Sequence, residues 1–233
     1  MRGSLYRSLA YQEVVTTILT GMKDGYRRCQ GFLTAEETER WRRRIDEQPE
    51  LFHAVSARGG LNLRYRVIDG HAAREHLPDL VEWAETRLRQ AAEEAVGEDL
   101  APIRDRKRSL RIQLYRGADE GFRWHFDVSP YSALLTLENT VRGATEVISP
   151  RLSRLLTPLY FLIYPLRQVF SIVRHRTIVS EPGDLLILHG TGVLHRAKAL
   201  ESDGERLVVV AVFEPVDSQP TPIRNWLART FNY

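Results

Sequence analysis

Residues 124–127 read Trp-His-Phe-Asp, and this short stretch decides how the rest of the chain is interpreted. His125 and Asp127 are two residues apart, so on an extended segment both side chains project from the same face. An imidazole and a carboxylate held in this way can occupy two neighbouring positions around one metal ion. The stretch therefore predicts part of a metal site, and a third ligand must come from elsewhere in the chain.

The best candidate for the third ligand is His195, which follows the strand predicted over residues 184–188. Two histidines and one carboxylate on one face of an octahedron leave three positions open, as in non-heme Fe(II) oxygenases. His189 ends the same predicted strand and is the alternative third ligand.

Arg206 adds a second element to this pattern, since it lies 11 residues after His195 and opens the apolar run 207–213. A guanidinium at this position can hold a carboxylate through two parallel hydrogen bonds. The other end of the same molecule could then bind the metal.

The chain places helical patterns before strand patterns. Thr34 and Glu37 form a capping box, which predicts a helix that continues through Trp41 and ends before Pro49. A second helix is expected over 78–96 and is closed by Gly97. One strand-like run, at 61–68, lies before the second helix. The other strand-like runs follow this helix and cover residues 110–115, 133–137, 184–188 and 207–213. This order is typical of an α+β chain whose helices support an antiparallel barrel or sandwich.

With these residues in place, the sequence resembles the Fe(II)/2-oxoglutarate-dependent dioxygenases, in particular their compact prolyl-hydroxylase-like branch. The family pattern is H-x-D, a distal histidine, and a basic residue about ten positions later. Shorter similarities are Tyr115-Arg116-Gly117, Asn139 with Gly143-Ala144-Thr145, Pro182-Gly183-Asp184, and Gly31-Phe32-Leu33. The resemblance spans about residues 32–214.

The resemblance implies a double-stranded β-helix, that is, a jelly-roll or cupin-like barrel, with the N-terminal helices packed on its outer sheet. It implies Fe(II), 2-oxoglutarate and O₂ as cofactors, with His125, Asp127 and His195 as metal ligands and Arg206 on the 2-oxoglutarate carboxylate. Many members carry Ser or Thr where this chain has Val208, so we expect Tyr115 to supply the missing hydroxyl.

Arg111, Gln113 and Tyr115 share one face of their predicted strand. Ordinary alternation would place this face in solvent and the leucines and isoleucine of the strand in the core. The resemblance instead places it inside the barrel, where Tyr115 and Gln113 would contact 2-oxoglutarate and Arg111 the substrate. Both interpretations stay open at this point.

The expected organisation is an N-terminal extension (1–30) with an amphipathic helix around 11–22, an oxygenase domain (31–214) and a C-terminal tail (215–233). Within the domain, residues 155–173 form an apolar insertion. Pro158 and Pro165 are expected to break it into short pieces, and it is too short and interrupted for a membrane span. It could pack on the barrel exterior, form a homodimer contact, or cover the active site as a lid.

Composition places the chain among ordinary globular proteins: 233 residues, 43% hydrophobic, 27% charged and a formal charge of +3. The charge is too small to argue for binding to nucleic acid or to a membrane, and a single cysteine excludes an intramolecular disulfide. With no apolar leader visible, we expect a cytoplasmic enzyme that hydroxylates or otherwise oxidises a C–H bond of a small molecule. The alternatives are the same chemistry on a protein or nucleic acid, or a metal-binding barrel without catalysis.

Overall fold

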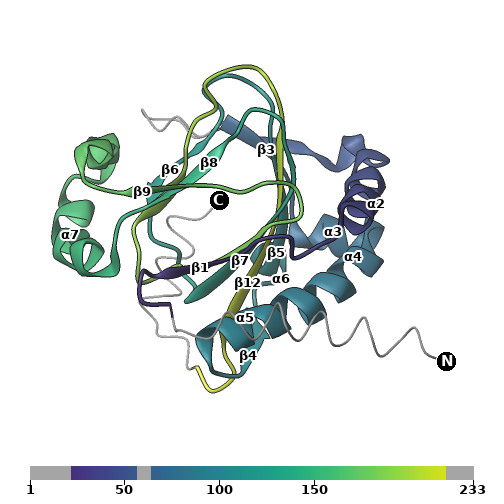
Figure 1. Cartoon of the computed structure of the whole chain (residues 1–233), viewed down its shortest axis with the longest axis horizontal. Coiled ribbons are helices and arrows are strands. Elements are labelled where there is room, and N and C mark those ends of the chain that lie inside the picture. Colours follow the sequence, from purple (N-terminus) through teal and green to yellow (C-terminus); the bar gives the residue numbers. More distant parts are fainter. Residues whose placement is uncertain (1–21, 57–63, 219–233) are drawn as a thin grey trace.

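The computed structural model describes residues 22–56 and 64–218. The amphipathic helix expected around residues 11–22 therefore lies, except for its last residue, outside the described part of the chain. The described residues form two antiparallel sheets, with helices at both ends of the molecule (Figure 1). None of the helices in this part of the chain combines the length and apolar character needed to cross a bilayer.

The larger sheet has eight strands in the order β1-β10-β7-β12-β5-β3-β2, with β4 beside β12. Its strands are β1 (Tyr26–Cys29), β2 (His53–Ser56), β3 (Arg64–Ile68), β4 (Leu100–Pro102), β5 (Leu110–Tyr115), β7 (Tyr131–Asn139), β10 (Leu185–His189) and β12 (Arg206–Pro215). The smaller sheet has the order β6-β11-β8-β9. Its strands are β6 (Phe122–His125), β8 (Ala144–Val147), β9 (Arg176–Val179) and β11 (His195–Ala197).

The first of these strands corrects one predicted boundary. The predicted N-terminal extension reaches residue 30, yet residues 26–29 form β1 and pair with β10. Arg28 fixes this edge strand, because its guanidinium donates to the Asp184 carboxylate with Nη2 and Oδ2 2.6 Å apart. The sheet therefore begins before residue 31.

The helices are α2 (Ala35–Asp46), η1 (Pro49–Leu51), α3 (Gly70–His76), α4 (Pro78–Trp83), η2 (Ala84–Leu88), α5 (Arg89–Val96), α6 (Arg106–Ser109), α7 (Pro150–Leu162) and η3 (Tyr164–Ile172). The predicted capping box is confirmed, since the Thr34 hydroxyl and the Glu37 carboxylate each accept from the other residue's backbone N–H. The predicted helix over 78–96 is confirmed as α4, the π-helical turn η2 and α5. It ends at Gly97, whose φ of 82° suits glycine.

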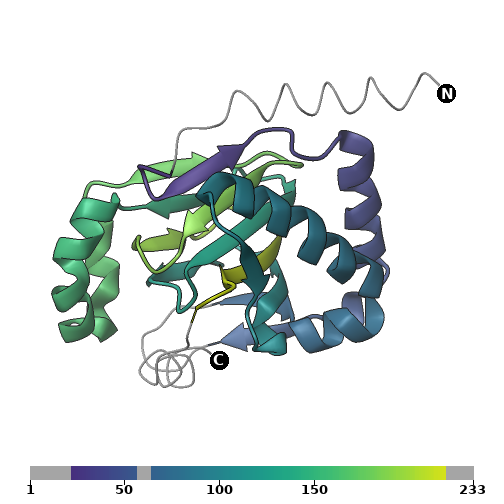
Figure 2. The same cartoon turned by 90° about the horizontal axis from the view of Figure 1, so that it is seen from below.

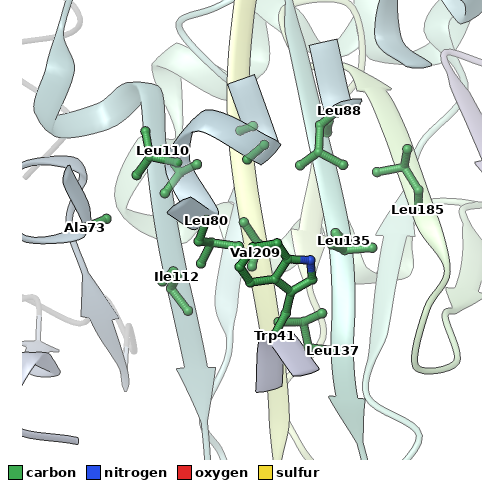
Figure 3. Close-up of a cluster of buried hydrophobic side chains, with 14 of the residues drawn as sticks. Trp41, Ala73, Leu80, Leu88, Leu110, Ile112, Leu135, Leu137, Leu185 and Val209 are labelled. Carbon is green, nitrogen blue, oxygen red and sulfur yellow. The ribbon is translucent and has the colours of Figure 1, made fainter. Parts of the chain in front are cut away.

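The main core lies between the larger sheet and the helices α2, α4 and α5, as the resemblance implied. Figure 3 shows Trp41 of α2 and Leu80 of α4 against Ile112 of β5 and Val209 of β12. Alternate residues of β5 and β12 face these helices and the remaining ones face the smaller sheet. The larger sheet therefore has two buried faces, and the second one carries the candidate site.

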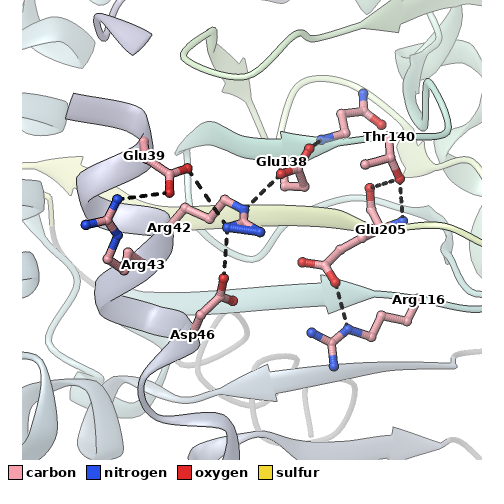
Figure 4. A network of polar contacts seen from close by, with 9 residues as sticks. Glu39, Arg42, Arg43, Asp46, Arg116, Glu138, Thr140 and Glu205 are labelled. Atoms are coloured by element: carbon pink, nitrogen blue, oxygen red, sulfur yellow. Dashed lines mark hydrogen bonds and ion pairs between the residues drawn. The ribbon is translucent and has the colours of Figure 1, made fainter. Parts of the chain in front are cut away.

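Ion pairs hold α2 on this sheet at its polar edge (Figure 4). Arg42 of α2 donates from Nε to Glu138 of β7 at 2.9 Å and also pairs with Asp46 at 3.1 Å. The contact with Glu138 ties α2 to the end of β7, and the pair with Asp46, which lies on α2 itself, orients the Arg42 side chain.

The apolar insertion forms α7 and η3, and one expectation about it was wrong. Pro158 does not break the helix but lies inside α7. A proline φ fits a helix, but the ring removes one backbone hydrogen bond and crowds the carbonyl four residues earlier. The packing of α7 on the smaller sheet offsets this cost. Nearby, the Thr157 hydroxyl donates to the Ser153 carbonyl at 3.0 Å. Pro165 instead falls at the start of η3, where its missing N–H is harmless.

Candidate metal centre

Two histidines meet across the smaller sheet. His195 on β11 pairs directly with His125 on β6, and their ring centroids are 4.2 Å apart. Each Nδ1 lies close to a backbone carbonyl two residues earlier, at 2.8 Å for His125 and 3.1 Å for His195. When Nδ1–H donates in these contacts, each Nε2 keeps its lone pair for a metal ion.

Asp127 follows β6 and completes the cluster. Its carboxylate oxygens lie 3.3 Å from Nε2 of His125 and 3.7 Å from Nε2 of His195. One ligand atom from each of the three residues can be chosen so that all lie within 4.8 Å of one another. This set has the donor types and the one-sided arrangement that suit a divalent iron.

Two further residues position this carboxylate. The Ser132 hydroxyl on β7 donates to Asp127 Oδ2 at 2.6 Å, and the Asp127 backbone N–H donates to the Gly190 carbonyl. A Cβ on Gly190 would lie 2.4 Å from Asp127 Oδ2, so only glycine lets the carboxylate lie here. Sequence reasoning missed both residues, because neither belongs to a recognisable motif.

The pKa values of the clustered residues favour the protonation states that bind a cation. Burial by itself would raise the pKa of Asp127, but the neighbouring imidazoles of His195 and His125 and the hydrogen bond from Ser132 outweigh burial and hold that pKa well below its usual range. Burial and the neighbouring His125 lower the pKa of His195 to about 4. At neutral pH the cluster therefore holds a carboxylate and an uncharged His195 imidazole, the forms that bind a metal.

Arg206 lies in the same pocket, on β12, and is buried. Its Nη1 donates to the Ala144 carbonyl at 3.1 Å and its Nη2 to the Thr145 hydroxyl at 2.9 Å, while its buried Nε has no partner. Among the described residues, no carboxylate lies within ion-pair distance of this guanidinium. A buried cation without a counter-charge is unfavourable, and a carboxylate ligand would relieve it.

The pocket answers the open question about β5. Arg111, Gln113 and Tyr115 all line it, opposite the smaller sheet, so this face is interior rather than solvated. Tyr115 is buried and its hydroxyl donates to Gln113 Oε1 at 3.0 Å. Burial raises the pKa of Tyr115, which keeps the hydroxyl protonated.

Some of the residues named from the sequence lie together in the pocket, and others lie outside it. The structure brings His125, Asp127, His195 and Arg206 together with the β5 residues. His189 lies outside this cluster, half-buried against Tyr131 with ring centroids 5.4 Å apart. Among the side chains of α7 and η3 that the structure describes, none lines the pocket, so these side chains give the lid interpretation no support.

Thr145 is a further pocket residue, and it supports Arg206. In the sequence it is only part of the Gly143-Ala144-Thr145 similarity, yet its hydroxyl accepts from Arg206 and so orients the guanidinium. Asn139 fixes the same segment, since its side-chain amide donates to the carbonyls of Gly143 and Ser180. The motif thus holds Arg206 from the neighbouring sheet.

Comparison with known proteins gives a consistent result for structure but none for sequence. No protein-family model matches the chain, and a search of the curated proteins finds no significant match. Many solved structures do match. The carbocyclase SnoK from nogalamycin biosynthesis, described as non-heme and α-ketoglutarate-dependent, has a TM-score of 0.65 and 18% identity, covering 89% of this chain and 87% of its own.

Two further matches were solved with bound ligands. The epimerase SnoN, in complex with Fe³⁺, α-ketoglutarate and nogalamycin RO, has a TM-score of 0.61 and 18% identity over 89% of this chain and 84% of its own. HygX from Streptomyces hygroscopicus, with nickel and 2-oxoglutarate, has a TM-score of 0.61 and 14% identity over 96% of this chain and 93% of its own. At these identities the likeness concerns the fold. The chain thus has the fold of the non-heme iron, 2-oxoglutarate-dependent oxygenases.

Proposed function

We propose that this protein is an Fe(II)- and 2-oxoglutarate-dependent oxygenase that oxidises a C–H bond of a small molecule. The observation that carries the proposal is the meeting, in one pocket, of the His125, Asp127 and His195 cluster with the buried, uncompensated Arg206. A metal-ligand cluster alone, or a buried arginine alone, would fit many kinds of protein. Together they provide a site for a metal and a site for the far carboxylate of a metal-bound acid.

In this proposal the three clustered residues hold the iron, and Ser132 and Gly190 keep the Asp127 carboxylate in place. Iron and 2-oxoglutarate together supply the oxidising power to attack an unactivated C–H bond. The chain's own task is to bind and orient these groups and to limit water around them. Hydroxylation is the default outcome, although the matched structures include an epimerase and a carbocyclase.

For 2-oxoglutarate, we assign Arg206 to the distal carboxylate, with Tyr115 and Gln113 beside it. Arg206 lies opposite Tyr115 in the β12–β5 register, and the guanidinium carbon is 5.9 Å from the Tyr115 ring centroid. The Tyr115 hydroxyl oxygen can still accept a hydrogen bond while it donates to Gln113. The carboxylate would therefore compensate Arg206 within a closed polar network.

Arg111 is assigned to the substrate. It lies four residues from Tyr115 on the same face of β5, so it marks the other end of the pocket. A second pocket shares Arg111 and Phe122 with the first and is also lined by His53, Lys107 and Arg108. Asp69, which pairs with Lys107 at 3.9 Å, and several apolar side chains complete this lining. Arg111, which both pockets share, is the group that would hold a carboxylate or phosphate of the substrate.

The test combines metal binding with turnover. Under anaerobic conditions, calorimetry should find one Fe(II) per chain, with 2-oxoglutarate bound only when iron is present. His195→Ala should weaken iron binding at least ~100-fold, because a direct ligand is lost. His189→Ala is the matched control and should bind iron normally.

Turnover is then measured as succinate formed from 2-oxoglutarate in air. The wild type and His189→Ala should form succinate, and His195→Ala should not. The proposal is wrong if iron binding survives His195→Ala but is lost in His189→Ala, or if the iron-loaded wild type never consumes 2-oxoglutarate.

A further inference from the structure

The exposed apolar side chains of this protein gather on one element pair. Of the seven large apolar side chains exposed among the described residues, six belong to α7 and η3. These six define the α7–η3 surface: Leu155, Leu159, Leu162, Leu166, Val169 and Ile172. An apolar patch of this kind on an otherwise ordinary surface marks a place of interaction.

The spacing of these residues makes each helix amphipathic. Leu155, Leu159 and Leu162 follow one face of α7, at intervals of four and three residues. In η3, Val169 and Ile172 are three residues apart, which matches the three residues per turn of a 3₁₀-helix, and Leu166 lies at a kink before them. Leu155, Leu162 and Ile172 are 76%, 81% and 86% exposed.

The opposite side of the pair is firmly packed. Tyr160 and Phe170 are buried against the outer face of the smaller sheet, and the Trp124 indole N–H donates to the Ser171 hydroxyl at 3.2 Å. Tyr160 also meets Phe126 edge-on at 5.2 Å. In Figure 2 the two green helices lie side by side at the end of the molecule away from α2. The exposed leucines therefore lie on helices whose other side is packed on the smaller sheet.

The Asp, Glu, Lys and Arg positions in and around α7 and η3 are all occupied by arginine. Residues 147–180 contain five arginines and no aspartate or glutamate. Arg151, Arg154 and Arg174 are exposed. The segment thus carries more positive charge than the whole chain, whose formal net charge is only +3.

We propose that the α7–η3 surface binds the surface of an anionic lipid bilayer and lies in its interface. An exposed apolar face flanked by arginines is the pattern of interfacial helices, which insert leucines among the acyl chains and bring cations to the headgroups. Neither helix is long enough to span the bilayer. The inference goes beyond the proposed reaction and does not depend on it.

A second copy of the chain is the main competing occupant. A symmetric dimer would bring the same patch of both copies together, so Arg151 and Arg154 would approach the arginines of the other copy. No acidic residue between 147 and 180 could neutralise them. Like charges brought together at an interface oppose association, whereas a bilayer containing anionic lipid attracts them. The charge pattern therefore favours the membrane surface.

Membrane binding would place the metal-bearing sheet next to the bilayer. β6 carries His125 at its end and contacts η3 through Trp124, and β11 carries both His195 and Arg196. Arg196 donates to the same Ser171 hydroxyl at 2.8 Å. One strand layer thus separates the lipid-facing helices from the candidate metal centre.

The test is co-sedimentation of the full chain with vesicles of phosphatidylcholine, with or without phosphatidylserine. We expect binding to the vesicles with phosphatidylserine to be at least ~10-fold tighter, and to weaken as salt is raised, because headgroup attraction is screened. Leu155→Ser/Leu162→Ser/Ile172→Ser should weaken binding at least ~10-fold. Val216→Ser removes an exposed apolar residue outside the surface and should change nothing.

A charge variant separates the two contributions. Arg151→Glu/Arg154→Glu should abolish the preference for phosphatidylserine, and Arg43→Glu on α2 is its matched control. Thermal unfolding and iron binding confirm that each variant is folded. The proposal is refuted if the wild type ignores both vesicle types or if the serine variant binds as well as the wild type. A wild-type dimer that becomes monomeric in the serine variant, without vesicle binding, would show that a second copy occupies the surface.

Discussion

Replacing Arg206 with alanine should weaken 2-oxoglutarate binding at least ~10-fold. In the structure, Arg206 donates to the Ala144 carbonyl and the Thr145 hydroxyl, which leaves a buried Nε without a partner. Hydrogen bonds to a charged group are worth about 1.5–3 kcal/mol, which corresponds to about 10- to 150-fold in affinity. Because no described carboxylate compensates this guanidinium, most of the effect should appear in ligand binding.

A thermal shift with Fe(II) under anaerobic conditions measures this directly. At a 2-oxoglutarate concentration of 100 times the wild-type Kd, the wild type gains about 2.7 kcal/mol of unfolding free energy. A variant that binds 10-fold more weakly gains only about 1.4 kcal/mol at the same concentration. The same comparison as a KM for 2-oxoglutarate should show the matching increase.

Two variants serve as controls for this experiment. Arg206→Lys keeps the charge but loses the planar fork, so it should restore part of the affinity. Arg111→Ala removes an arginine from the same pocket and should raise the KM for substrate while leaving the 2-oxoglutarate shift unchanged. If Arg206→Ala keeps the full wild-type shift, the carboxylate anchor lies elsewhere and the reasoning from uncompensated charge is wrong.

Packing and capping contacts give three further predictions. Gly190→Ala should weaken iron binding at least ~10-fold, because the new Cβ would overlap the Asp127 carboxylate, while Gly117→Ala, where a Cβ meets nothing nearer than 3.6 Å, should bind iron normally. Trp41→Ala should lower the free energy of unfolding by about 3–5 kcal/mol in urea denaturation, since the ring is buried in the main core; a loss below about 1 kcal/mol would contradict this packing. Thr34→Ala should lower it by about 1 kcal/mol, whereas Thr34→Ser, which keeps the capping hydroxyl, should stay near the wild type.

Local chemistry accounts for what could be predicted from the sequence. A strand repeats every two residues, so the H-x-D spacing alone places His125 and Asp127 on one side. The capping box at Thr34 and the glycine stop at Gly97 depend on hydrogen bonds within a few residues, and both were confirmed. Arg206 was found because a basic residue after the distal histidine matches a known pattern; its role on 2-oxoglutarate stays a prediction.

Other features depend on contacts between distant segments, which no local pattern contains. Alternation in β5 predicted two faces but could not decide which was interior, because both are covered, one by the helices and one by the smaller sheet. The sequence favoured His195 over His189 as the third ligand, but only the pairing of β11 with β6 shows that His195 lies against His125. Strand pairing of this kind is set by the whole sheet.

The supporting residues show the same division. Ser132 and Gly190 reach Asp127 from β7 and from the loop after β10, and nothing in their own neighbourhood marks them. Pro158 is expected to end a helix on local grounds, but α7 continues through it while packed on the smaller sheet. The sequence by itself therefore determined the donor types and their spacing, because these follow from the backbone period. Only the tertiary structure decided which groups face one another, because that depends on how the two sheets are brought together.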